Sequence, residues 1–199
     1  MIILKFDGLF SEFGEDLDQT RNAGFMCYGW IILRDQQIIG RGHGGVARGE
    51  DATSNVAEYL AMIEGLDALN DLNICDEPIE VHGDAKCVID QMCGLSAVNS
   101  PTIVPFYRRA KRLAERFEYI EWVWKPRRHN KDADWLTRHA LRQIFSDIKG
   151  YQEVIKKFDY RVAKRSHNNK FLHLLDLRVY FPPDSTMEFP VQNFFNQTT

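Results

Sequence analysis

The first third of the chain carries hydrophobic residues in short blocks, a pattern typical of strands. Residues 2–6, 25–33 and 38–47 are apolar and rich in β-branched or aromatic side chains. Residues 34–37, between the second and third blocks, have the polar composition of a hairpin turn. The pattern therefore predicts three consecutive strands that form an antiparallel meander.

From Thr53 onward the hydrophobic period lengthens to that of a helix. Apolar residues recur on one helical face, with Thr53 or Ser54 as the candidate N-cap, at Val56, Tyr59, Leu60, Ile63, Leu66 and Leu69. The remaining patterns predict strands over residues 78–83 and 119–124, and helices over residues 85–92, 101–116 and 130–148. This order predicts an α/β fold with a mixed five-stranded sheet, three antiparallel strands followed by parallel ones, flanked by helices.

The last fifty residues are expected to form a C-terminal extension. We predict one domain over residues 1–148 and an extension of unknown role over residues 149–199. Residues 171–181 have the composition of a strand, and the segment is too apolar for a disordered tail. Packing on the domain, dimerisation and covering part of a substrate channel are all open roles for it, so the oligomeric state is left undetermined.

Composition narrows the class of protein. The chain of 199 residues is 44% hydrophobic and 27% charged, as in ordinary globular proteins. No apolar run approaches the ~20 residues of a membrane helix, and the first ten residues lack a basic segment before their apolar stretch. The four cysteines form no Cys-x-x-Cys pair. We therefore expect reduced thiols, a cytoplasmic location and no membrane partner.

Charge is distributed unevenly along the chain. Residues 1–100 contain 6 Lys and Arg against 17 Asp and Glu, whereas residues 101–170 contain 18 against 8. A basic segment within an acidic chain fits internal charge pairing, a solvated helix face or a surface for a polyanion.

Four acidic residues stand close to predicted core elements. Asp7 and Asp84 each directly follow a predicted strand, Glu58 lies one turn into the amphipathic helix, and Asp134 lies in the first turn of the last helix. Each alone has a structural explanation: a turn at Asp7, a helix cap at Asp84, or a favourable helix dipole at Glu58 and Asp134.

Together these residues favour a metal site. If the first, fourth and fifth strands are parallel neighbours, the four carboxylates converge on one patch, where their repulsion requires neutralisation. Oxygen ligands without clustered Cys or His favour Mg²⁺ or Mn²⁺ over Zn²⁺. Two such ions about 3.5–4 Å apart can clamp the attacking and leaving oxygens of a phosphodiester.

At these positions the sequence resembles the type I ribonuclease H family. The resemblance rests on four segments in the family's order, spread over residues 1–142: residues 6–8 (FDG), 53–61 (TSNVAEYLA), 83–91 (GDAKCVIDQ) and 126–136 (PRRHNKDADWL). It implies the ribonuclease H fold, two Mg²⁺ ions that Mn²⁺ can replace, and cleavage of the RNA strand of RNA/DNA hybrids to 3′-hydroxyl and 5′-phosphate ends.

The resemblance also implies roles for the four carboxylates. Asp7 is expected to bridge both ions, Glu58 and Asp84 to hold one side, and Asp134 to hold the ion that activates water. One further expected role lies in the loop before Asp134, where His129 or a neighbouring arginine would assist product release.

Further residues are expected to contact the hybrid. Asn55 is the candidate for a contact with the RNA 2′-hydroxyls, which the wide minor groove of a hybrid exposes. Other expected substrate contacts are Gly8, Arg127 and Arg128, together with Arg108 and Arg112, which would replace a basic handle that the chain lacks.

Two alternative functions remain open from the sequence. The same fold supports 3′–5′ exonucleases, because a fold does not fix a function. A binding module without catalysis is the other alternative, although a module that only binds nucleic acid gains nothing from carboxylates that repel phosphates.

Overall fold

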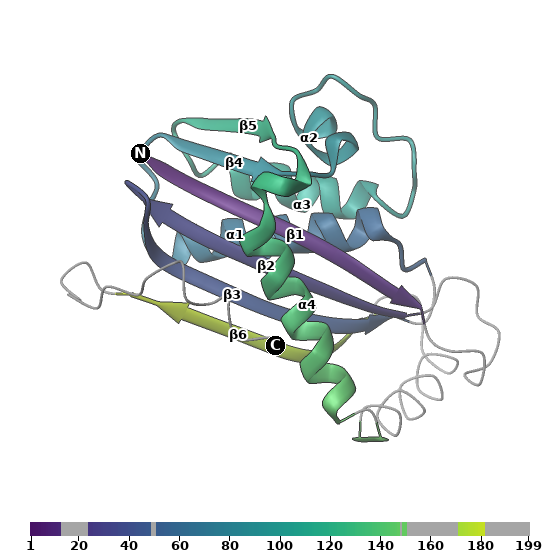
Figure 1. Ribbon diagram of the computed structural model, residues 1–199. Coiled ribbons are helices and arrows are strands. Elements are labelled where there is room, and N and C mark those ends of the chain that lie inside the picture. The colour runs from purple at the N-terminus through teal and green to yellow at the C-terminus, as the bar shows by residue number, and fades with distance from the viewer. Residues whose placement is uncertain (13–23, 49–50, 148, 151–170, 182–199) are drawn as a thin grey trace.

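One mixed sheet with helices on both faces forms the protein (Figure 1). The computed structural model describes residues 1–12, 24–48, 51–147, 149–150 and 171–181. Its elements, in chain order, are β1 (Ile2–Glu12), β2 (Gly24–Arg34), β3 (Gln37–Arg48), α1 (Ser54–Asp71), β4 (Ile79–Gly83), α2 (Lys86–Met92), α3 (Val104–Ala114), β5 (Ile120–Trp124), the 3₁₀ turn η1 (Arg127–His129), α4 (Lys131–Ser146) and β6 (Phe171–Tyr180).

The strand order confirms the predicted topology. The sheet runs β5-β4-β1-β2-β3-β6. The pairs β1–β2 and β2–β3 are antiparallel, while β1–β4 and β4–β5 are parallel. The first, fourth and fifth strands are therefore parallel neighbours, as the sequence pattern required for the carboxylates to meet.

The first strand is longer than its apolar block. The prediction that Asp7 follows the strand was wrong, because β1 continues to Glu12 and Asp7 lies within it, in register with Gly29 of β2. The reason is the partner strand: β2 offers backbone hydrogen bonds along its whole length, so β1 remains extended after its own hydrophobic alternation ends.

Helices cover the two faces of the sheet differently. In Figure 1, α4 crosses one face of the sheet, while α1 and α3 lie behind it. Most of the core lies on the α1 side, where Trp30, Tyr59, Phe6 and Leu66 are fully buried. A second, smaller cluster under α4 contains Phe25, Cys27, Ala47, Ala140 and Ile144.

Two glycines allow these helices to come close to the sheet. A Cβ at Gly8 would lie 2.2 Å from the backbone carbon of Ala57 on α1, and a Cβ at Gly29 would lie 2.7 Å from the carbonyl oxygen of Ala133 on α4. Only glycine fits such close approach. The helices that carry Glu58 and Asp134 therefore pack directly against β1 and β2, close to Asp7.

The predicted C-terminal strand exists and makes the sheet one strand larger than expected. Strand β6 pairs antiparallel with β3, giving six strands instead of five. The expected number of strands in the sheet was one too few, because the pairing of residues 40–48 with residues 171–180 cannot be recognised from local sequence patterns. The other parts of the extension, residues 151–170 and 182–199, lie outside the described residues, and the division at residue 148 stays a prediction.

The helices of the described segments include none that is both long and apolar enough to span a membrane.

Candidate active site

The acidic residues meet where β4 ends beside β1. The parallel pairing of these strands runs from Ile2 opposite Ile79 to Lys5 opposite His82. Continuing the same register places Asp7 opposite Asp84, just past the last paired residues. Ligand-binding residues often gather at the carboxyl ends of parallel strands. Here β4 ends at Gly83, while β1 continues to Glu12 alongside β2.

Three of the four predicted carboxylates form one cluster. Oxygen atoms of Asp7, Glu58 and Asp84 all lie within 4.8 Å of one another. Asp7 and Glu58 are buried, with 3% and 8% of their surface exposed, and Asp84 is partly buried. We call these three residues the acidic cluster.

Each member of the acidic cluster is held by the elements around it. Thr53 caps α1 by accepting a hydrogen bond from the Val56 backbone N–H (3.2 Å), which fixes the start of the helix that carries Glu58. The Gly8 backbone N–H donates to Glu58 Oε2 (3.1 Å). Beyond β4, Trp124 Nε1 donates to the Asp84 backbone carbonyl (3.0 Å).

Crowding raises the pKa values of the acidic cluster. Burial, with the charges of Asp84 and Asp134, raises the pKa of Asp7 to about 7. Burial and the charges of Asp7 and Asp84 raise the pKa of Glu58 well above its ordinary value, and burial also raises the pKa of Asp84. The positive charge of Arg127 does not offset these effects, and hard oxygen donors at this spacing fit a Mg²⁺ or Mn²⁺ ion.

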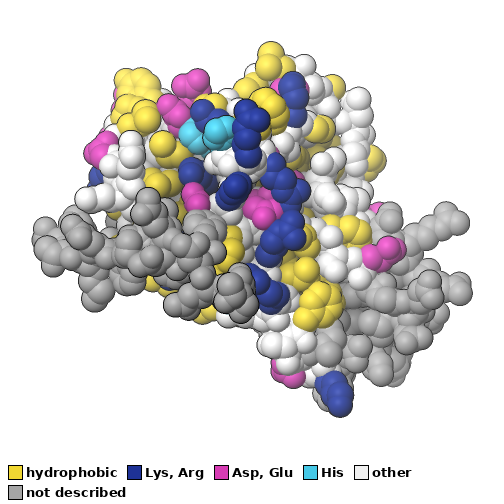
Figure 2. All heavy atoms as spheres, viewed as in Figure 1, with side chains coloured by type: hydrophobic (Ala, Val, Ile, Leu, Met, Phe, Trp, Pro, Cys, Tyr) yellow, Lys and Arg dark blue, Asp and Glu magenta, His cyan; other side chains and the backbone are white. Residues whose placement is uncertain are grey.

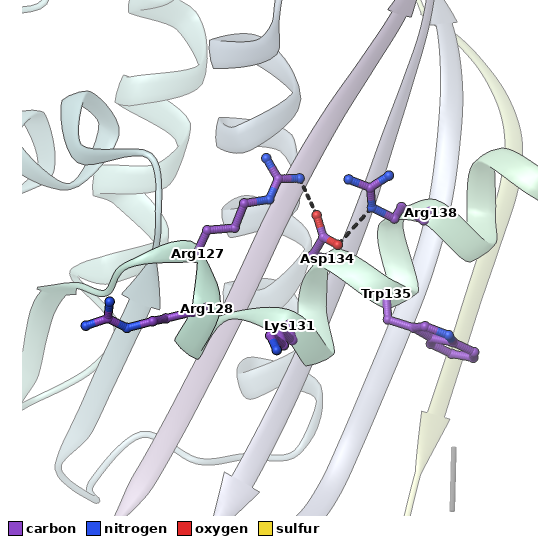
Figure 3. Close-up of a pocket in the computed structure, with 6 residues that line it drawn as sticks. All are labelled: Arg127, Arg128, Lys131, Asp134, Trp135 and Arg138. Atoms are coloured by element: carbon purple, nitrogen blue, oxygen red, sulfur yellow. Dashed lines mark hydrogen bonds and ion pairs between the residues drawn. The ribbon is translucent and has the colours of Figure 1, made fainter. Parts of the chain in front are cut away.

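Asp134 lies beside the acidic cluster but has partners of its own. Its carboxylate accepts hydrogen bonds from Arg127 and from Arg138 Nε (2.8 Å), as Figure 3 shows. Burial alone would raise the pKa of Asp134, but these two guanidinium groups outweigh it and leave the pKa below its ordinary value. Its charge still acts on Asp7 and Asp84.

Two buried side chains that the sequence reasoning missed anchor α4 to β1. Asn130 Nδ2 donates to the Phe6 carbonyl (2.7 Å), and Thr137 Oγ1 donates to the Asp7 carbonyl (2.9 Å). Both side chains have no exposed surface. They bracket Asp134 on its helix, so they determine how far its carboxylate lies from Asp7. The sequence signal that could have revealed them is a polar residue at a position of α4, or just before it, that faces the sheet.

Of the side chains in the loop before α4, Arg127 is the one that bonds to Asp134. Arg128 Nε instead donates to His129 Nε2 (3.0 Å), and both residues are exposed. The guanidinium of Arg127 also acts electrostatically on Asp7 and Asp84. Arg127, rather than His129, is therefore the residue of this loop that interacts with the carboxylates.

Of the other predicted substrate contacts, some lie next to the acidic cluster and others lie on a different helix. Gly8 adjoins Glu58 directly, and Asn55 is exposed three residues before Glu58 in the first turn of α1. Arg108 and Arg112 are exposed on α3, which packs against α1, and are not part of the acidic cluster.

Comparison with known proteins identifies the family. The model of the family described as reverse transcriptase-like matches residues 17–140. The chain is 34% identical over 121 residues to ribonuclease HI of Halobacterium salinarum, covering 60% of this chain and 58% of that protein. It is also 34% identical over 125 residues to a bifunctional protein of Mycobacterium tuberculosis, of which it spans 31%.

Solved structures agree with the sequence matches. The RNase H1 of Halobacterium salinarum has a TM-score of 0.60 at 31% identity, covering 71% of this chain and 98% of that one. The N-terminal RNase H domain of the Mycobacterium tuberculosis protein has a TM-score of 0.62 at 29% identity, covering 74% and 97%. LC11-RNase H1, solved in complex with an RNA/DNA hybrid, has a TM-score of 0.59 at 26% identity, covering 73% and 99%. The chain therefore belongs to the reverse transcriptase-like family and is a homologue of the type 1 ribonucleases H.

Proposed function

We propose that the protein is a divalent-metal-dependent endonuclease that hydrolyses the RNA strand of RNA/DNA hybrids, leaving 3′-hydroxyl and 5′-phosphate ends. The observation that carries the proposal is the acidic cluster, whose oxygens lie within 4.8 Å of one another beside Asp134. The similarity to a ribonuclease HI and to a structure bound to a hybrid supports it. The chain spans only part of the length of its curated relatives. We therefore base the proposed activity on the site in this chain and not on the activities of the whole relatives.

The residues present fit divalent ions. Asp7, Glu58 and Asp84 would hold one ion, and Asp7 together with Asp134 would hold a second. Bound Mg²⁺ or Mn²⁺ would supply Lewis acidity at the phosphoryl oxygens and a nucleophilic water at neutral pH. Metal ligands must be deprotonated, so the raised pKa values of Asp7 and Glu58 mean that ion binding displaces protons from the cluster.

The protein's own contribution is to hold these oxygens in place before substrate arrives. The Gly8 N–H orients Glu58, Trp124 fixes the backbone at Asp84, and Asn130 and Thr137 fix α4 against β1. Positioned charge of this kind is effective because no reorganisation is required during the reaction.

Arg127 takes the role that the sequence left open between His129 and the arginines. Its guanidinium bonds to Asp134 and acts on Asp7 and Asp84, so it is within reach of a phosphate at the carboxylates. As a phosphate enters, Arg127 can exchange its bond to Asp134 for one to the phosphate, which leaves Asp134 available to an ion. The reverse exchange favours departure of the product.

Recognition of RNA is proposed to start at α1. Asn55 is exposed in the same first turn that positions Glu58, so its amide can reach the minor groove next to the scissile bond. A 2′-hydroxyl there both donates and accepts hydrogen bonds, which is what separates RNA from DNA at one position. Gly8 contributes indirectly, because the lack of a side chain lets β1 pack against the first turns of α1 and its N–H donates to Glu58.

The cysteines favour a reducing compartment. All four are unpaired: Cys27, Cys75, Cys87 and Cys93. Since disulfides are rare in the cytosol and common outside it, we keep the cytoplasm as the proposed location.

A hybrid with an internally and an end-labelled RNA strand tests the proposed function. The parent chain with Mg²⁺ is expected to yield internal RNA fragments with 3′-hydroxyl ends, and none from duplex DNA, single-stranded DNA or with EDTA. Asp7→Asn is expected to abolish cleavage while the fold is kept. Asp132→Asn, on the same helical turn as Asp134, is the control: Asp132 pairs with Lys5 (2.9 Å) outside the acidic cluster.

Cleavage by the Asp7→Asn variant at the parent's rate would show that the site is misassigned. A ladder that shortens the RNA strand one nucleotide at a time from its 3′ end would replace the endonuclease with an exonuclease. Hybrid binding without turnover in Mg²⁺ or Mn²⁺ would leave only a binding module.

A further inference from the structure

A pocket beside Asp134 is lined mainly by positive side chains. The 3₁₀ turn η1 contributes two arginines and α4 contributes the rest, as Figure 3 shows; the lining residues are Arg127, Arg128, Lys131, Asp134, Trp135 and Arg138. Residues 131, 134, 135 and 138 are spaced three and four apart, so they lie on one face of the helix. The pocket therefore holds four cations against one carboxylate.

Two of these cations share one carboxylate, and the other two pair with none among the described residues. Arg127 and Arg138 both bond to Asp134. Among the residues that the structure describes, Arg128 and Lys131 form no ion pair with a carboxylate, and Arg128 donates only to the His129 ring. Both side chains are exposed. The pocket thus keeps a positive charge that favours an anion.

The surface around the pocket has the same character. Figure 2 shows Lys and Arg side chains gathered over η1 and α4, around the acidic side chains at their middle. Farther along α4, Arg142 is exposed and acts electrostatically on His139. A basic surface next to a phosphodiester site is expected to follow a nucleic-acid backbone.

Trp135 supplies an apolar wall. Its ring stacks on that of His139, with the ring centroids 5.0 Å apart and the planes 5° from parallel. His139 in turn meets the edge of His43, whose Nε2 lies 2.8 Å from Gln143 Oε1. A ring supported in this way keeps its orientation and offers a flat surface to a ribose next to a bound phosphate.

The position of the pocket indicates which phosphate it fits. Asp134 lines the pocket and also acts on Asp7 and Asp84, so the pocket adjoins the place where the scissile phosphate is proposed to bind. The neighbouring phosphates in the cleaved strand are the nearest further anions. Those of the other strand lie across the wide minor groove of a hybrid.

We propose that Arg128, Lys131 and Trp135 form a subsite for a backbone phosphate of the RNA strand, within two nucleotides of the scissile bond. The inference rests on the proposed function for the identity of the cleaved strand. The subsite holds the RNA strand while Arg127 and Asp134 exchange partners, so it affects binding of the hybrid more than the rate of cleavage.

Salt dependence tests whether the pocket binds a phosphate. Binding of a hybrid is measured without metal, for the full chain carrying Asp7→Asn to prevent cleavage. Adding Arg128→Ala and Lys131→Ala together is expected to weaken binding roughly tenfold and to lower the slope of log affinity against log salt by about 1, as for one lost phosphate contact. The control is Arg34→Ala, a cation at the far end of β2 that pairs with Glu77, and it should leave the slope unchanged.

A walk of uncharged linkages tests which phosphate it is. One methylphosphonate is moved along the RNA strand and, in a second series, along the DNA strand, around a single permitted cleavage position. One RNA position within two nucleotides of that bond should weaken binding roughly tenfold in the Asp7→Asn chain, and should have no further effect once Arg128 and Lys131 are also replaced.

Sensitive positions found only in the DNA strand would overturn the proposal, as would an equal loss with and without the two cations. Either result leaves cleavage of the unmodified hybrid by the parent untouched, so the proposed function would stand. If the parent cleaves no hybrid, the proposed function fails, and the salt dependence of binding still reports whether the pocket binds a phosphate.

Discussion

The acidic cluster and the basic pocket differ in how the fold builds them. Asp7 lies on β1, Glu58 on α1 and Asp84 directly after β4, and the first two are buried. Arg128 and Lys131 are exposed on a short turn and the start of α4. The proposed chemistry therefore depends on buried groups next to the sheet, whereas the proposed binding of substrate depends on exposed side chains beside it. Asp134 lies beside the acidic cluster, acts on Asp7 and Asp84, and also lines the pocket, so substitutions should separate reaction from binding.

The largest expected effect falls on the buried side of this comparison. Glu58→Gln keeps the shape of the side chain and its hydrogen bond from Gly8, but removes a carboxylate from the acidic cluster. We expect cleavage of the hybrid to fall by roughly 10³-fold or more, measured as single-turnover rate. Glu118→Gln, an exposed residue after α3, should retain the parent's rate. Equal rates for the two variants would remove Glu58 from the reaction.

A smaller loss of cleavage rate is expected at Asp134, which lies between the acidic cluster and the pocket. Asp134→Asn should lower the cleavage rate by roughly 10²- to 10³-fold, because an ion loses a charged ligand while the anchors at Asn130 and Thr137 remain. Hybrid affinity measured without metal should not fall, since Arg127 and Arg138 lose their carboxylate partner and become available to phosphate. Weaker binding of the hybrid by this variant would contradict the proposed exchange.

Stability should reveal the crowding of the acidic cluster directly. Because the pKa of Asp7 is raised from its ordinary value to about 7 in the folded state, the folded state binds more protons than the unfolded state between about pH 4 and about pH 7. Without metal, the free energy of unfolding is therefore expected to fall as pH rises from about 4 through about 7. Asp7→Asn should remove part of this loss and be more stable than the parent by roughly 1–3 kcal/mol at pH 8.

Thermal unfolding in EDTA at pH 5 and pH 8 measures this difference, with about 2–4 °C expected per kcal/mol. Adding Mg²⁺ at pH 8 should raise the melting temperature of the parent and not that of Asp7→Asn. If the two chains show the same pH dependence, Asp7 is not held in a crowded acidic environment.

The smallest expected effect on catalysis lies at the opposite edge of the sheet. Arg178 on β6 bonds to Glu64 (2.6 Å) and Asp71 (3.0 Å) of α1. Arg178→Ala leaves the buried Glu64 without this partner, so we expect a loss of roughly 2 kcal/mol in unfolding free energy. Denaturant unfolding measures it. The cleavage rate should stay within about twofold of the parent's, and a large drop would mean that β6 positions α1 for catalysis.

Local patterns predicted most of the elements and the meeting of the acidic residues. The helical spacing from Thr53 and the order of strands were enough to place Glu58 near the parallel strands. The extension of β1 past Phe6 and the pairing of β6 with β3 were not predictable, because both depend on a partner strand distant in sequence. Tertiary pairing overrides local preference in such cases.

The finer features of the candidate site depend on contacts that no spacing encodes. The sequence placed Asp134 with the other carboxylates but gave no sign that two arginines hold it. Likewise, Asn130 and Thr137 read as ordinary helix residues until their hydrogen bonds to β1 are seen. Long side chains on a turn and a helix can take many directions, and only the packed fold selects one.

The most direct test of the account is diffraction from a crystal of the parent chain soaked in Mn²⁺. Asp7, Glu58 and Asp84 lie close enough for their oxygens to share an ion. We expect an anomalous peak among these three carboxylates, absent from crystals of the Asp7→Asn variant. A well-ordered map without such a peak, in which the three carboxylates diverge, would contradict it.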